Sequence, residues 1–374
     1  GDAGGNRSQI LSFEQRGDSS FYVRSVPMQW PHRSGVAGEC VFACLYTLRD
    51  HVITMEATII NNRRDSTQYR AGSQEMPAVY TNGPWYQLVT YLGDAPFTGR
   101  PTEILVDKLD QKGWPWIHFY TPENWVALLD KQGYGIGVFQ PEVMNFNGGF
   151  HPNDSHKGEG LEKDVATGHI APVGTQILDY NIVWTYKTSF VLGTVNDIRS
   201  YAQANWQVPI NPVWEFKDSR SNWYYSGKLR DSGFPISEAL DLSFSADAAL
   251  QSPITFWKAE ENPTLTITGD IYAEAKELDL RIEIQPFSPA DNTDWLNWSE
   301  GTHQVEQEQK LKAERFPKRA PIVVKKRIVA DGKRRTYSIA LDAAKAYVGA
   351  MKSVKITFEN QGTAKISKVG FISK

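Results

Sequence analysis

The chain has 374 residues, of which 41% are hydrophobic and 22% are charged, and its formal net charge is −3. This length favours two domains, and this composition excludes general disorder. The charge argues against a dedicated nucleic-acid-binding protein, which would carry a basic excess over a whole domain. No apolar run reaches the roughly 20 residues that cross a membrane. No signal peptide opens the chain at Gly1-Asp2-Ala3, so we expect a mature or trimmed product.

The first half is predicted to consist of antiparallel strands. Polar and apolar residues alternate over 9–16 and 20–27, which predicts a hairpin. Longer strands are expected over 39–48 and 51–61. The fully apolar face of the second is expected to pack inward, and it consists of Ile53, Met55, Ala57 and Ile59.

Two cysteines, Cys40 and Cys44, are the only ones in the chain. In a strand they would lie roughly 13 Å apart at about 3.3 Å per residue, which is beyond the reach of a disulfide. We therefore expect two buried free thiols.

Glycines alternate with other residues at Gly133, Gly135 and Gly137. No helix pattern follows them directly, so they predict a strand with small side chains and not a nucleotide-binding loop. Residues 141–170 are predicted to be irregular. A helix is expected over 195–204, with Asn196 as its N-cap.

The second half is predicted to be a jelly-roll β-sandwich of about ten short strands. Among them, 264–273 and 278–285 are expected as separate strands, and Asp331-Gly332 as a hairpin turn. Two prolines in residues 206–212 favour a domain boundary there. The expected organisation is all-β, with domain 1–205, linker 206–212 and domain 213–374.

The stretch from Ser73 to Tyr86 is the candidate centre of the chemistry. Pro77 and the Asn82-Gly83-Pro84 turn exclude a regular helix, so the backbone is extended and bent. Such a backbone can present a carboxylate, an amide, a phenol and an indole to a sugar. An ordinary strand and turn, with Glu75 solvated and Trp85 in the core, is the alternative.

The segment 141–170 also contains imidazoles and carboxylates. Zinc at the imidazoles or calcium at the carboxylates would be a structural site, although the spacing is diagnostic of neither. The candidate ligands are His151, Asp154 and His169. A solvated polar loop is the competing interpretation, and no cofactor is expected to be required.

A resemblance rests on four motifs in the first half: Pro27-Met28-Gln29-Trp30, Asn61-Asn62-Arg63, Gln74-Glu75-Met76-Pro77-Ala78-Val79-Tyr80 and Gly83-Pro84-Trp85-Tyr86. With them, the first half resembles secreted bacterial carbohydrate-processing proteins built on a galactose-mutarotase-like supersandwich. The second half resembles an accessory jelly roll that binds carbohydrate. The resemblance implies a secreted or periplasmic protein and a polysaccharide or oligosaccharide substrate, and it leaves the reaction open.

The favoured function is that of a polysaccharide-cleaving glycoside hydrolase, and a lyase and a glycan-binding protein are the two alternatives. A glycoside hydrolase would use two carboxylates, Glu75 and a partner such as Glu56, Glu123 or Glu39. A polysaccharide lyase would act by β-elimination on a uronic polymer, with an acid and base from His118, Tyr80 or Tyr86. A non-catalytic glycan-binding protein would only stack and hydrogen-bond sugars. The expected substrate contacts are Gln74, Trp30, Arg63, Trp85, Tyr86, Trp114 and Trp116.

Overall fold

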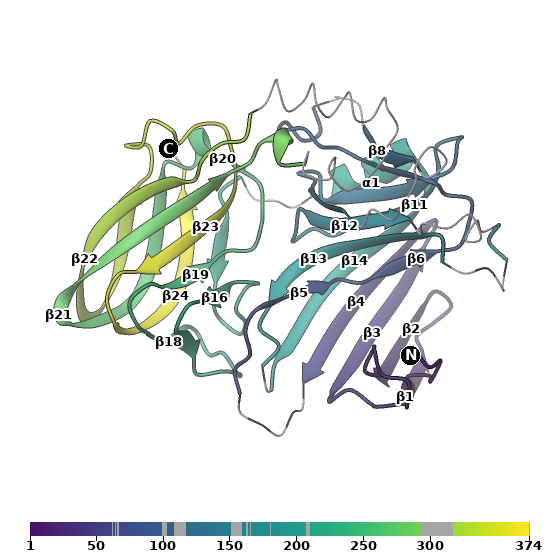
Figure 1. Ribbon diagram of the computed structural model, residues 1–374, viewed down its shortest axis with the longest axis horizontal. Coiled ribbons are helices and arrows are strands. Elements are labelled where there is room, and N and C mark those ends of the chain that lie inside the picture. Colours follow the sequence, from purple (N-terminus) through teal and green to yellow (C-terminus); the bar gives the residue numbers. More distant parts are fainter. Residues whose placement is uncertain are drawn as a thin grey trace.

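The computed structural model describes residues 1–61, 63, 65, 67–98, 103–107, 117–150, 159–161, 164, 166–179, 181–206, 210–292 and 317–373. Nearly all regular structure in these residues is antiparallel β, which confirms the all-β prediction. Figure 1 shows two groups of strands side by side, one from each half of the chain. Within the described residues, no helix has the length and apolar character needed to span a membrane.

A nine-stranded sheet forms the larger layer of the first half. Its hairpins arise from the alternating patterns of the sequence, so the predicted strands near residues 9–27 and 39–61 are confirmed. Cys40 and Cys44 lie on one of them as free thiols, and Cys44 is buried. In spatial order the strands are β1 Gln9–Gln15, β2 Ser20–Val26, β3 Cys40–Arg49, β4 Val52–Asn61, β14 Val183–Thr194, β11 Tyr134–Phe139, β10 Trp125–Leu129, β7 Gln87–Thr90 and β8 Glu103–Asp107.

A five-stranded sheet packs against it through an apolar inner face. Phe119, Phe146 and Ile170 from this sheet are fully buried with Leu88 and Val126 from the nine-stranded sheet. The strands are β5 Gly72–Glu75, β6 Val79–Thr81, β9 Ile117–Tyr120, β12 Asn145–Phe150 and β13 Gly168–Gln176. The prediction that 141–170 is irregular was wrong for β12 and for the start of β13, because nearly all residues of these strands are buried and the alternation of polar and apolar residues is lost.

A single α-helix, α1 (Val195–Asn205), occurs in the described part of the chain. Its N-cap is Thr194, whose side chain accepts from the Asp197 N–H in a capping box, so the predicted cap at Asn196 was wrong by two residues. A Cβ added to Gly137 would lie 2.3 Å from a methyl carbon of Ile198 in α1. Gly137 therefore makes room for the helix, while Gly135 lies close to the Leu128 backbone. β11 spans Tyr134–Phe139, which confirms the strand interpretation.

The second half is a ten-stranded arrangement around its own core. Leu265, Ile282, Ile356 and Ile366 are among its fully buried side chains. The strands are β15 Val213–Glu215, β16 Tyr224–Ser226, β17 Leu229–Asp231, β18 Leu240–Phe244, β19 Ala248–Gln251, β20 Trp257–Lys258, β21 Thr264–Pro286, β22 Ile322–Ala340, β23 Ala350–Phe358 and β24 Gly362–Ile372. The described residues of this half also contain two short 3₁₀ turns, Ala259–Glu261 and Pro289–Asn292.

β21 is one strand of 23 residues where two were expected. Its first part, Thr264–Tyr272, pairs with β24, and its last part, Leu280–Pro286, pairs with β23. The ladder with β22 shifts register near Tyr272, opposite Asp331. Asp331-Gly332 therefore lies at an irregularity inside β22, and the prediction of a hairpin turn there was wrong.

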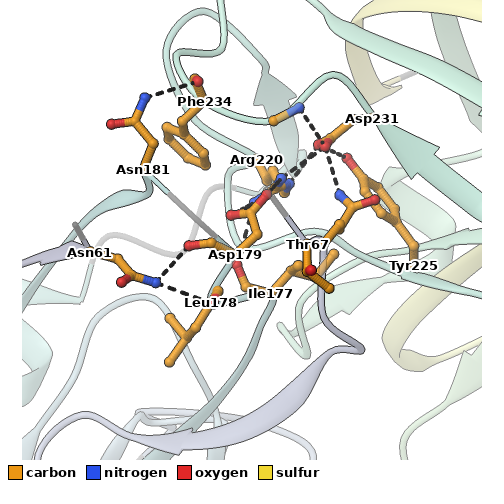
Figure 2. Close-up of polar contacts among 12 residues, drawn as sticks. Asn61, Thr67, Ile177, Leu178, Asp179, Asn181, Arg220, Tyr225, Asp231 and Phe234 are labelled. Atoms are coloured by element: carbon orange, nitrogen blue, oxygen red, sulfur yellow. Dashed lines mark hydrogen bonds and ion pairs between the residues drawn. The ribbon is translucent and has the colours of Figure 1, made fainter. Parts of the chain in front are cut away.

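A buried polar cluster joins the two halves, and we call it the joint: Asp179, Arg220, Tyr225 and Asp231 (Figure 2). The Arg220 guanidinium lies 2.8 Å from Asp179, which follows β13, and 2.6 Å from Asp231 in β17. The Tyr225 hydroxyl donates to Asp231 at 2.7 Å. Gln68 of the first half donates to the same carboxylate at 2.7 Å. The halves are thus fixed by charges that are fully paired.

Candidate active site on the five-stranded sheet

The outer face of the five-stranded sheet carries the polar residues that the sequence singled out. Directly opposed residues of antiparallel strands project from the same face. Tyr80 of β6 is opposite His169 of β13, and His118 of β9 is opposite Asn147 of β12. Glu75 of β5 is opposite Val173, four residues from His169 along the same strand and on the same face. The face therefore brings together groups from five strands.

Glu75 and His169 form the centre of this face. The Glu75 Oε1 atom lies 3.3 Å from His169 Nε2, where a protonated imidazole forms an ion pair with it. The two side chains differ in accessibility, since Glu75 is 38% exposed and His169 only 1%. Ala171 is the residue between them on this face of β13, and its small side chain leaves room for the contact. The Glu75 carboxylate is thus accessible to solvent, while the His169 imidazole that contacts it is buried.

Tyr80 covers the imidazole of His169. Their ring centroids are 4.9 Å apart, and the tyrosine is 55% exposed. Partial burial, together with the nearby charge of Glu75, raises the pKa of the Tyr80 phenol above its usual value. At neutral pH the phenol therefore keeps its proton and acts as a donor. We call Glu75, Tyr80 and His169 the outer-face cluster.

Asn147 extends the outer-face cluster across the sheet. It is opposite Ala171, one strand across and two residues along from His169, so their Cα atoms are roughly 8 Å apart at ordinary sheet spacings. Asn147 is only 8% exposed, yet its Oδ1 accepts no hydrogen bond from the described residues. His118, opposite Asn147, is exposed. In the strand order β5-β13-β12-β9, Asn147 therefore lies two strands and His118 three strands from Glu75 on the same face.

Three predicted contacts near Glu75 lie elsewhere on the same segment. Gln74 is adjacent to Glu75 in β5, so strand alternation turns it to the opposite face of the sheet. Trp85 packs against the core between the two sheets, as the alternative interpretation had it. Tyr86 is half-buried, and the charges of Asp164 and Glu159 help burial to raise its pKa.

The proposed carboxylate partners of Glu75 are not brought to it. Glu56 lies on β4 in the nine-stranded sheet and pairs with Lys187 at 3.1 Å. Glu123 is fully buried and binds Arg199, with 2.6 Å between the closest atoms. Glu39 is an exposed residue next to β3. None of these three forms a hydrogen bond or ion pair with Glu75 among the described residues.

Two further residues that were predicted to bind substrate, Arg63 and Trp30, lie in other parts of the chain. Arg63 donates to Asp65 and to the Thr67 carbonyl, and its guanidinium stacks on Tyr69. Trp30 is exposed in the segment that joins β2 and β3 of the nine-stranded sheet. Neither contacts a residue of the outer-face cluster.

Four predicted residues, Trp114, Trp116, His151 and Asp154, lie outside the described residues. Of the three metal-ligand candidates, His169 is described, and it contacts Glu75. Among the described residues, no group of three histidines, cysteines or carboxylates has the geometry to hold a metal ion. The roles of His151 and Asp154 stay predictions.

Comparison with known proteins yields fold-level likeness alone. No family model matches the sequence, and no curated protein matches it. Among solved structures, a galactose mutarotase-like protein from Lactobacillus casei is 12% identical over 48% of this chain and 72% of its own, with a TM-score of 0.31. A GH36 α-galactosidase from Geobacillus stearothermophilus is 14% identical over 52% of this chain and 28% of its own, with a TM-score of 0.31.

A Paenibacillus xanthan lyase aligns with 94% of this chain and 42% of its own, at 10% identity and a TM-score of 0.28. This chain therefore spans less than half the length of the lyase and about a quarter of the galactosidase. These neighbours are proteins named for carbohydrate chemistry. At such low TM-scores, the likeness assigns neither a family nor an activity to this chain.

Proposed function

We propose that the chain is a carbohydrate-processing enzyme whose outer-face cluster catalyses β-elimination on a uronic polysaccharide. The observation that carries this proposal is the combination of an exposed carboxylate and an exposed, protonated phenol that both contact one buried imidazole. One base and one acid within reach of the same sugar are the groups that elimination requires.

Hydrolysis by paired carboxylates is supported less well. That mechanism places two carboxyl groups about 5 to 10 Å apart, on either side of the glycosidic bond. The described residues that were expected to supply the second carboxylate, Glu56, Glu123 and Glu39, are engaged or located elsewhere. Elimination needs no second carboxylate, so it fits the outer-face cluster better.

In the proposed step, the Glu75 carboxylate removes the proton from the carbon next to the uronate carboxyl group. The electron pair forms a carbon–carbon double bond, and the glycosidic oxygen leaves from the neighbouring carbon. The Tyr80 hydroxyl donates its proton to that oxygen, and solvent then returns both residues to their starting states. In this proposal His169 holds Glu75, and the Asn147 amide, two strands away on the same face, hydrogen-bonds the uronate carboxylate and stabilises its developing charge.

The test is incubation of the protein with neutral, sulfated and uronic polysaccharides. We expect new reducing ends together with the ultraviolet absorbance of an unsaturated uronate, on uronic polymers alone. Reducing ends without that absorbance would identify a hydrolase and contradict the elimination step. Binding without either product would identify a glycan-binding protein and contradict the proposal as a whole.

A further inference from the structure

A cleft of about 1050 Å³ lies where the two halves of the chain meet. One wall comes from the first half, with Glu142, Gln176 and the β14 residues from Val183 to Thr185. The other wall comes from the second half, with Trp214 and the turn from Asp218 to Asn222. This volume is at the upper end of the range of small-molecule sites, so several sugar units would fit. None of the outer-face cluster lines it.

A chain of polar groups crosses the cleft from one wall to the other. Asn222 donates from Nδ2 to Glu142 Oε2 at 2.9 Å, and its Oδ1 accepts from Gln176 Nε2 and from Trp184 Nε1. The backbone at Asn222 has an unusual conformation, because Ser221 and Asn222 have positive φ values of 47° and 59°. Two successive left-handed residues other than glycine are uncommon, and they persist where surrounding contacts fix them.

Glu142 is the group of this chain best placed to meet a ligand. It is accessible from the cleft, and its Oε1 accepts no hydrogen bond from the described residues. Burial among the cleft walls raises the pKa of its carboxyl, although the hydrogen bond from Asn222 lowers it. A sugar hydroxyl that donates a hydrogen bond to this partly desolvated carboxylate would stabilise its charged form.

The charges of the lining indicate what kind of ligand fits. Glu142 and Asp218 are acidic and form no ion pair with the described residues. Glu215 is paired with Lys217 and Lys368, and Arg220 is neutralised by the two carboxylates of the joint. Lys187 is the remaining cation of the lining, and it pairs with Glu56. An acidic cleft disfavours uronate and sulfate groups. The half-buried indole of Trp214 offers an apolar surface beside these acceptors.

We propose that this inter-half cleft binds a neutral oligosaccharide, separately from the outer-face cluster. A neutral sugar supplies hydroxyl donors for Glu142 and Asn222 and a C–H face for Trp214. The site does not depend on the elimination chemistry, so it stands or falls independently of the proposed function.

The test is calorimetric titration of the full chain with neutral tetrasaccharides of glucose, xylose and mannose, and with a tetrasaccharide of galacturonic acid. The blocking variant is Val183→Trp, because Val183 is 50% exposed in the wall of the cleft. Its matched control is Leu192→Trp, on the same strand, 40% exposed and outside the cleft. We expect a neutral tetrasaccharide to bind and the blocking variant to weaken it at least about tenfold, or about 1.4 kcal/mol.

The control variant and Glu75→Gln should leave that binding unchanged, and Glu142→Gln should weaken it without altering the circular dichroism spectrum or the melting temperature. Equal binding by Val183→Trp and the wild type would overturn the location. Tighter binding of the galacturonate, binding of a lysine-rich peptide in place of sugar, or no binding of any neutral tetrasaccharide would overturn the ligand class.

Discussion

The outer-face cluster and the joint are both built from carboxylates beside a nitrogen cation or imidazole, yet they differ in accessibility and in pairing. In the joint, the Asp179 and Asp231 side chains have no exposed surface, and Arg220 contacts both. In the outer-face cluster, Glu75 and Tyr80 are open to solvent, and only His169 is buried. The first arrangement satisfies its charges internally. The second leaves a base and an acid available to a substrate.

This difference separates stability from chemistry. Removing one member of a fully buried ion cluster leaves an uncompensated charge, so its cost appears in folding. Replacing the exposed Glu75 carboxylate by an amide of the same shape keeps an oxygen beside the buried His169, so its cost appears in catalysis if the residue acts there. Substitutions in the joint should therefore lower the free energy of unfolding, whereas substitutions in the outer-face cluster should lower the turnover rate.

The largest effect is expected for Glu75→Gln. This variant keeps the shape of the side chain but cannot accept a proton, so turnover of the uronic polymer should fall by at least about a thousandfold, equivalent to about 4 kcal/mol. Steady-state assays and the melting temperature should be measured together. Retention of a tenth of the activity at an unchanged melting temperature would give Glu75 a binding role instead.

Tyr80→Phe should lower turnover by about a hundredfold or more, since it removes the donor to the leaving oxygen. Tyr134→Phe is the matched control, because Tyr134 is similarly exposed at the start of β11 in the other sheet. A substrate with an activated leaving group should rescue Tyr80→Phe in part. Equal losses in both variants would rule out acid catalysis by Tyr80.

Arg220→Ala should lower the free energy of unfolding by about 3 to 5 kcal/mol, because it strands two buried carboxylates. Arg327→Ala provides the comparison: Arg327 also binds a carboxylate, Asp279, at 2.8 Å, but it is 66% exposed. The control should lose less than about 1 kcal/mol. Urea titration measures both, and similar losses would show that burial does not distinguish the two ion pairs.

The smallest effect concerns acid stability. Burial favours the neutral form of Asp231, but hydrogen bonds from Arg220 and Tyr225 outweigh it and lower the pKa below 3.8. A lowered folded-state pKa stabilises the protein above the ordinary pKa and loses that contribution as the pH falls through the folded value. The stability difference between wild type and Asp231→Asn should therefore shrink below about pH 4, by at most about 1.4 kcal/mol per pH unit. A difference that is constant from pH 7 to pH 3 would contradict this linkage.

The strands could be predicted where one face is polar and the other apolar. The patterns around β1 to β4 are of this kind, because alternation follows directly from the pleat. β12 and β13 were missed since both faces are covered: every residue of β13 except Thr175 is buried. A strand buried on both faces loses the alternation on which such predictions rest.

The candidate site could be predicted only in part for a related reason. Glu75 and Tyr80 stand in one short segment with unusual composition, so the sequence singled them out. His169 and Asn147 come from two other strands, and only the sheet register places them beside Glu75. Alternation along residues 168–176 would have put His169 on a defined face, had that segment been recognised as a strand. Register between distant strands is not written in local sequence.

The double pairing of β21 has a consequence for how the second half opens. Its first part is hydrogen-bonded to β24 and its last part to β23, while β22 follows it along the other edge. β21 therefore cannot separate from its neighbours without breaking its hydrogen bonds to β22, β23 and β24 together. Native-state hydrogen exchange should therefore find the central amides of β21 released only in global opening, whereas those of short β16 and β17 exchange through local fluctuations.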